Sequence, residues 1–195
     1  MSNPNVGMIY PVFAPLVSHT DGSMPTYGNG RVLQEARNAT VTKTVADNPL
    51  YGDDRVVDND NETTAVSISF ESTGLDDQDR VTVLGDTLRT DGEYWENSGA
   101  TPKGGFAYIR RMRKDGTRKF EAWLALCVQF QEATQNTTTR EGQINWGTPT
   151  LTGNCESLYV DDSGDPRFRL HKTFDTAAAA KSWINGMLNI TATTT

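Results

Sequence analysis

The sequence is poor in the side chains on which catalysis and covalent cross-linking most often depend. Its 195 residues include two cysteines, Cys127 and Cys155, and two histidines, His19 and His171. A chain of this length can bury a core without disulfides or a structural metal, so we expect reduced thiols in a protein made in a cytoplasm. A Cys127–Cys155 disulfide remains an alternative. No nucleophile elbow accompanies the histidines, which argues against a Ser-His-Asp hydrolase.

Long apolar runs are also missing. Hydrophobic residues make up 36% of the chain, and the mean hydropathy is −0.55. No segment approaches the roughly 20 apolar residues of a membrane-spanning helix. The polar Met1–Gly7 segment does not have the pattern of a secretory signal. We therefore expect no membrane partner, and we expect long solvated loops or arms around the core.

The sequence contains the beginnings of cofactor-binding and metal-binding motifs, but none of these motifs is complete. Gly28–Gly30 lacks the third glycine of a dinucleotide fingerprint, and no phosphate-binding loop ends in Gly-Lys-Ser/Thr. Asp58–Glu62 is similar to the start of a calcium loop, but Thr63 replaces the glycine at position six and Ser69 the glutamate at position twelve. An irregular calcium site stays open, and a solvated loop is the better interpretation. We expect no catalytic residues, no cofactor and no metal.

Acidic side chains outnumber basic ones, with a formal net charge of −7. Such a chain repels phosphate backbones, which argues against tight binding of nucleic acid. The basic residues gather in one patch: Arg110, Arg111, Arg113, Lys114, Arg118 and Lys119. The patch could contact phosphate, but an acidic neighbour is the better partner. Head-to-tail stacking would place Arg111 and Lys114 against the acidic loop 53–62 of another copy.

Many segments of the sequence have the residue pattern of β-strands. Phe106–Arg113 and Arg118–Gln131 flank an Asp-Gly turn, which predicts a long hairpin with the even-numbered residues from 120 to 130 on one face. Val32–Val45 reads as one or two strands and Ala65–Phe70 as one. Four shorter segments also read as strands: 143–146, 148–152, 158–160 and 167–174. We expect a mainly β fold, a sandwich or barrel.

Two short helices are predicted beside this β body. Leu75–Leu84 has acidic residues in its first turn and Gly85 as a stop. Thr176–Leu188 begins after Asp175 as its expected cap, and Ala177–Ala180 favour helix. The first helix flanks the body, and the second is C-terminal.

The first 30 residues read as an extended arm, because four prolines disfavour both helix and interior strand. Its apolar residues, among them Ile9 and Phe13, would lie on the body or on a neighbouring subunit. The predicted organisation is an arm over 1–30, a β-sandwich domain over 31–174, and a C-terminal helix and tail over 175–195.

The order of several short motifs resembles that of one known family. They are Leu50-Tyr51-Gly52-Asp53-Asp54, the strand 66–70, Val83-Leu84-Gly85, Pro102-Lys103-Gly104-Gly105-Phe106, and Lys114-Asp115-Gly116 with the long strand after it. In this order, over residues 30 to 150, they resemble the major tail protein family of long-tailed, non-contractile bacteriophages. No motif is specific by itself, and the ordered set carries the resemblance.

The resemblance implies a tail-tube type β-sandwich that assembles into stacked hexameric rings. Their acidic lumen would conduct DNA to the host without sequence-specific binding. Implied partners are other copies, the tape-measure protein, phage DNA, and tail-tip and terminator proteins. The implied place is the virion tail, assembled in the host cytoplasm. Expected subunit-interface residues are Tyr51, Asp53, Asp54, Asp58, Asp60, Arg111, Lys114, Ile9 and Phe13.

Other functions remain open from the sequence. A capsid decoration protein or a secretion-system tube subunit would share the self-associating β character. A carbohydrate-binding module could use aromatic platforms built from Trp95, Trp123, Trp146 and Trp183. An unrecognised hydrolase is disfavoured by the missing motifs.

Overall fold

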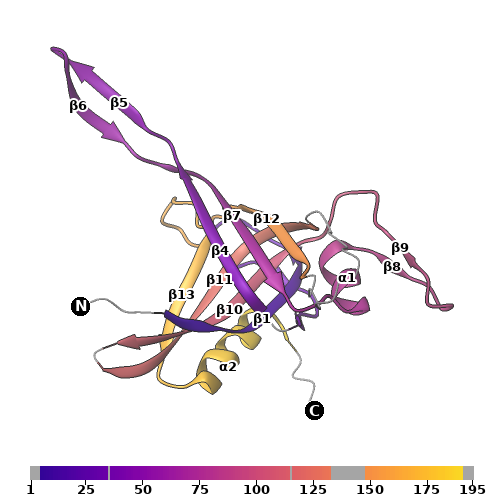
Figure 1. Cartoon of the computed structure of the whole chain (residues 1–195). Helices are drawn as coiled ribbons and strands as arrows, with labels where there is room; N and C mark the ends of the chain where they lie inside the picture. The colour runs from indigo at the N-terminus through magenta and orange to yellow at the C-terminus, as the bar shows by residue number, and fades with distance from the viewer. Residues whose placement is uncertain (1–4, 35, 115, 133–147, 191–195) are drawn as a thin grey trace, which may run out of the picture.

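A computed structural model describes residues 5–34, 36–114, 116–132 and 148–190. It confirms the mainly β class with two flanking helices (Figure 1). The strand predicted at 143–146, the centre of the Asp115-Gly116 turn and the tail 191–195 lie outside the described residues. Leu158–Val160 is no strand, since Leu158 makes a single bridge to Arg167.

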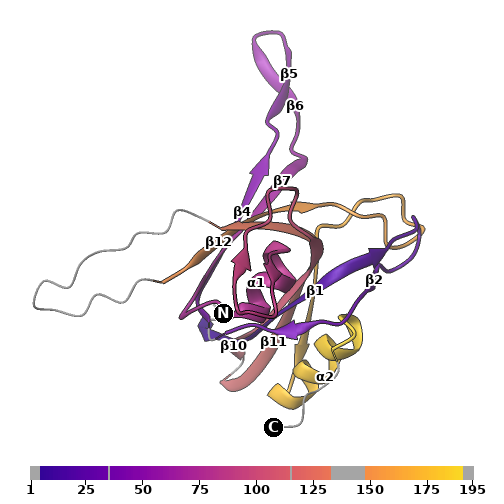
Figure 2. The ribbon, with the colours of Figure 1, turned by 90° about the vertical axis from the view of Figure 1, so that its right-hand side faces the viewer.

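Nine strands form one sheet, and every pair of neighbours in it is antiparallel. Its main path runs β2 (Thr26–Tyr27), β1 (Asn5–Ser18), β10 (Lys103–Lys114), β11 (Thr117–Glu132), β12 (Thr150–Glu156), β7 (Thr63–Ser72) and β4 (Ala36–Val45). Beside this path, β13 (Arg169–Phe174) pairs with β11 and β3 (Arg31–Val32) with β1. β1 and β4 are far apart in this strand order, yet they contact each other. The sheet therefore curls as a barrel does (Figure 2).

The predicted β10–β11 hairpin is present, but the side chains of β11 change faces of the sheet part-way along the strand. An irregularity between Gly104 and Phe106 places an extra residue in β11, since Gly104 faces Val128 and Phe106 faces Ala125. Such a bulge shifts the side-chain alternation by one. The even-numbered residues of β11 therefore do not share one face: Leu124 belongs to one core cluster, and Val128 to the other.

The two core clusters lie on opposite faces of this sheet. The first fills the inside of the curl with aromatic rings, and Phe106 makes edge contacts to Phe70 and Phe130 at 5.2 and 5.1 Å between ring centroids. The second lies between the sheet and the C-terminal helix, where Leu124 and Ile184 are fully buried. Burial of both faces explains why β11 reads as a nearly continuous apolar run.

The first helix, α1 (Asp77–Leu84), begins two residues later than predicted and ends at the predicted residue. The Asp76 carboxylate accepts a hydrogen bond from the Asp79 amide (2.7 Å), and Gly85 takes the left-handed conformation with φ of 76°. Arg31 of β3 forms ion pairs with both Asp76 and Asp79. These contacts fix α1 against the end of the curled sheet (Figure 2).

The C-terminal helix, α2 (Ala177–Met187), starts one residue later than predicted. Thr176, not Asp175, is the cap, and its hydroxyl accepts a hydrogen bond from the Ala179 amide (3.2 Å). The Asp175 carboxylate instead forms an ion pair with Lys119 of β11.

The N-terminal segment is not an arm in its described part. β1 pairs with β10 on one side and with β2 and β3 on the other, so it lies within the sheet. Pro11 sits at the irregularity between Ile9 and Val12, where the ladder does not need its missing N–H. Its carbonyl still accepts a hydrogen bond from the Leu33 amide (2.9 Å). The proline count therefore misled the prediction for residues 1–30.

The two cysteines are free and buried. Cys155 lies directly opposite Val128, so its side chain is on the face opposite to that of Cys127. Burial raises the pKa of Cys127 to about 11 and that of Cys155 to about 12. Both thiols are protonated near neutral pH and unreactive.

Candidate interaction surfaces

A two-stranded ribbon projects from the body where a polar loop was predicted. β5 (Asn48–Gly52) and β6 (Arg55–Asp60) pair with each other and, within the described residues, with no strand of the main sheet (Figure 1). Asp53 and Asp54 form the turn, with φ of 49° and 59°. Two consecutive positive φ angles are typical of a type I′ hairpin turn, which aspartate tolerates. The Asp53-Asp54 pair was the sequence signal that could have predicted a hairpin here instead of a loop.

The projecting ribbon exposes three apolar side chains. Tyr51 and Val56 are opposite each other and are 68% and 52% exposed, and Val57, the unpaired residue at an irregularity of β6, is 60% exposed. An isolated two-stranded ribbon is marginally stable in water. The ribbon thus has the features of a surface that is covered by a partner.

The predicted acidic residues are all on this ribbon. Asp53 and Asp54 are exposed at its tip and have no ion-pair partner among the described residues. Asp58 and Asp60 belong to β6, opposite Leu50 and Asn48 in the backbone register, and their side chains lie outside the described part.

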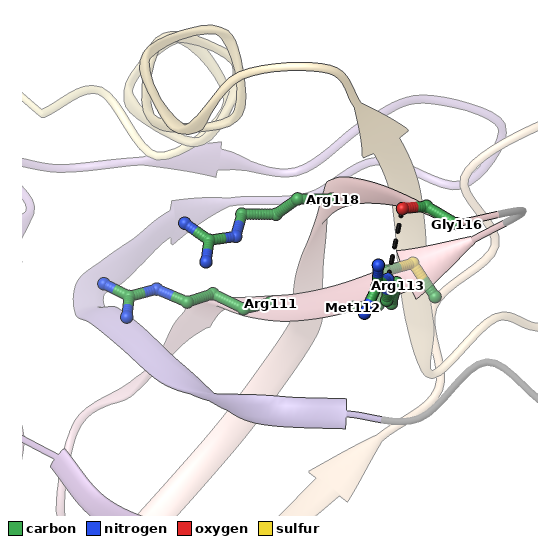
Figure 3. Close-up of a pocket in the computed structure, with 5 residues that line it drawn as sticks. All are labelled: Arg111, Met112, Arg113, Gly116 and Arg118. Atoms are coloured by element: carbon green, nitrogen blue, oxygen red, sulfur yellow. Dashed lines mark hydrogen bonds between the residues drawn. The ribbon is translucent and has the colours of Figure 1, made fainter.

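The predicted basic residues are at the far end of the β10–β11 hairpin. Arg113 lies directly opposite Arg118, an unfavourable pairing of like charges. In Figure 3 the Arg111 and Arg118 side chains extend in the same direction, while Arg113 donates from Nε to the Gly116 carbonyl (3.1 Å). These three arginines and Lys114 have no carboxylate partner within the described residues. A cavity of about 410 Å³ lies among the arginines.

The structure does not bring the acidic and basic groups together within one chain. The two hairpins leave the body in different directions (Figures 1 and 2). Phe13 is fully buried in the first core cluster, so its expected place in a subunit interface is corrected to a place in the core. Ile9 is half-buried opposite Ile109 and packs against the second cluster.

A cluster around Trp123 was not predicted. The Trp123 indole stacks on His171 across the strands (4.8 Å between centroids), and the guanidinium groups of Arg110 and Arg169 lie 4.5 and 4.8 Å from its ring centroid. Glu121, 7% exposed, accepts hydrogen bonds from Arg110 (2.5 Å) and from Trp123 Nε1 (2.7 Å). These residues belong to β10, β11 and β13, and only the pairing register of the three strands shows that they lie together.

The charge of Glu121 is stabilised by these contacts. Burial alone would raise its pKa, but the hydrogen bonds from Arg110 and Trp123 outweigh burial, and the pKa lies below its usual value. The carboxylate therefore stays ionised and holds both partners in place.

Comparison with known proteins leaves the family open. No family model matches this chain. No curated protein matches it either. A similar chain occurs in a cryo-EM structure of the anti-feeding prophage (AFP) baseplate, 6-fold symmetrised; the similarity covers 91% of this chain and 99% of that one, with 14% identity and a TM-score of 0.34. At this TM-score the similarity carries no argument for a shared fold or function.

Two further features concern ligands and membranes. Within residues 5–34, 36–114, 116–132 and 148–190, no three or more His, Cys, Asp or Glu side chains come together as metal ligands do. No helix in the same part of the chain is long and apolar enough to cross a bilayer.

The three tryptophans in the described part of the chain do not form a shared platform. Trp123 is committed to Glu121 and His171, and Trp183 packs half-buried beside the second core cluster. Trp146 lies outside the described residues, and of the other three only Trp95 is exposed. A carbohydrate-binding face of several aligned aromatic rings is therefore not supported by the described part of the chain.

Proposed function

We propose that this protein is a self-associating structural subunit, not an enzyme, and that it builds a bacteriophage tail tube. The observation that carries the proposal is the projecting β5–β6 ribbon, which exposes Tyr51, Val56 and Val57 far from the chain's own core. Contact with another copy would remove these side chains from water at about 25 cal/mol per Å² of apolar area.

The charge distribution supports an asymmetric, head-to-tail contact. The ribbon tip carries Asp53 and Asp54, whereas the tip of the other hairpin carries Arg111, Arg118 and Lys114. Because the two tips point in different directions, they complement each other between copies. A contact of two different surfaces propagates into rings or filaments.

The finer features of the proposal rest on the sequence resemblance. Hexameric rings would stack into a tube around the tape-measure protein and later the DNA, with tail-tip and terminator proteins at its two ends. The net charge of −7 would keep the DNA backbone from adhering to the lumen. Assembly would take place in the host cytoplasm, and the product would be the virion tail.

Removing the aromatic anchor of the ribbon tests the proposal. We expect Tyr51→Ser to fold normally and to lower the assembled fraction at least about tenfold in sedimentation velocity, since an interface aromatic often contributes 2 kcal/mol or more. Tyr159→Ser is the matched control, because Tyr159 is also an exposed tyrosine but lies outside the ribbon. Equal assembly of the two variants would reject the ribbon as the contact.

A further inference from the structure

A second hairpin projects from the side of the molecule that carries α1. β8 (Thr87–Leu88) and β9 (Tyr94–Trp95) pair with each other and stand apart from the main sheet (Figure 1). Trp95 is 57% exposed, yet its position is defined: Nε1 is 3.5 Å from Glu93 Oε2, and the Arg89 guanidinium lies 4.9 Å from its ring centroid. The hairpin thus presents a large, exposed aromatic side chain that contacts two residues of its own hairpin.

The charge of this hairpin is negative. From Thr87 to Glu96 it has one basic residue, Arg89, against the acidic residues Asp91, Glu93 and Glu96, an excess of two negative charges. Arg89 is already paired with Asp91 (3.7 Å). Glu96 Oε1 lies 4.0 Å from an Arg80 nitrogen of α1, but its side chain is 86% exposed. Glu93 and Glu96 are therefore the carboxylates that a partner would meet beside the indole ring.

A cavity of complementary character lies at the foot of the β5–β6 ribbon. It measures about 470 Å³ and is formed by the end of β4, the start of β7, the middle of β11 and the segment 165–171. Its charged lining residues other than His171 are Lys43, Arg167, Arg169, Glu62 and Asp165, an excess of one positive charge.

The positive charge in this cavity is available to a partner. Arg167 pairs with Asp165 (3.5 Å), whereas Lys43 and Arg169 have no carboxylate partner among the described residues. The apolar lining comes from Val66, Trp123 and Phe168. A cavity with an apolar floor and cations at its wall suits an aromatic side chain flanked by carboxylates.

The hairpin and the cavity are on opposite sides of the body. Figure 1 shows the β8–β9 hairpin on one side and β13 with the foot of the ribbon on the other. One chain therefore cannot fill its own cavity with this hairpin. Copies related by rotation can each donate a hairpin and receive one, which is how a closed ring is made.

We propose that the β8–β9 hairpin of one copy docks into the Lys43–Trp123–Arg169 cavity of the next copy around a ring, with Trp95 as the buried anchor. The inference rests on the self-association proposed above and adds a lateral contact to it. Trp95 supplies the apolar area, and Glu93 and Glu96 meet Lys43 and Arg169.

Disulfide trapping between two separately made variants tests this contact. Glu96→Cys and Lys43→Cys subunits are mixed under assembling conditions and oxidised, and we expect a covalent dimer on non-reducing gels. The native cysteines do not compete, because both are buried with raised pKa values. Adding Trp95→Ala to the Glu96→Cys subunit should lower the yield of dimer at least about tenfold.

The matched control replaces Lys43→Cys by Ser182→Cys, an exposed position on α2. Equal yields from the two mixtures, or an undiminished yield with Trp95→Ala, would overturn the docking. Normal assembly without a Glu96→Cys to Lys43→Cys dimer would overturn the docking and leave the tube proposal intact. Failure of the wild-type chain to assemble at all would overturn both.

Discussion

Replacing Glu121 by glutamine changes one buried charge and almost no volume. The carboxylate accepts two hydrogen bonds from Arg110 and one from Trp123, and a glutamine oxygen keeps an acceptor but loses the charge. A hydrogen bond to a charged group contributes about 1.5–3 kcal/mol. Because Arg110 is partly exposed, solvent screens the interaction, and we expect a smaller loss of about 1–2 kcal/mol in the free energy of unfolding near pH 7.

The pH dependence of this loss gives the sharper test. The folded-state pKa of Glu121 lies below its usual value of 4.5, so its charge stabilises the fold above that pH, and the stabilisation is lost as the pH falls through the folded pKa. The difference between wild type and Glu121→Gln should therefore shrink on acidification from about pH 7 to about pH 3. Urea unfolding followed by tryptophan fluorescence measures it, with the exposed Glu62→Gln as control. A difference that stays constant or grows would refute the reasoning.

Three other changes have defined outcomes. Gly104→Ala would place its Cβ 2.3 Å from the Ala14 carbonyl oxygen, a backbone atom that cannot move aside, so we expect insoluble protein or a loss of at least about 3 kcal/mol in urea unfolding. Gly186→Ala meets no atom within 4 Å on α2 and should stabilise the chain by about 0.5–1 kcal/mol; a loss of stability would contradict the helix there. Ile184→Ala empties part of the second core cluster, and about 2–4 kcal/mol should be lost in urea unfolding; a cost below 1 kcal/mol would mean that α2 is not packed on the sheet.

The elements that were predictable are those that local chemistry determines. The acidic first turn and Gly85 indicated α1 to within two residues, and β10 and β11 form the long hairpin that the Asp-Gly pair predicted. Capping and turn formation involve residues within four positions of one another, so the sequence displays them directly.

What was missed depends on contacts between distant segments. β1 is an interior strand because its bulge takes up Pro11, and the change of facing in β11 follows from a bulge that no residue type marks. The pairing of Trp123 with His171 requires the register of β11 and β13, which are far apart in the chain. Of the expected interface residues, Tyr51 and Arg111 are exposed, whereas Phe13 became core because β1 lies inside the sheet.

Electron microscopy of the purified, concentrated protein in negative stain tests the central claim most directly. We expect rings with six-fold symmetry that stack into hollow tubes, and we expect the Tyr51→Ser variant to lose these tubes. A population that stays monomeric at high concentration, or assemblies that persist unchanged in that variant, would contradict it.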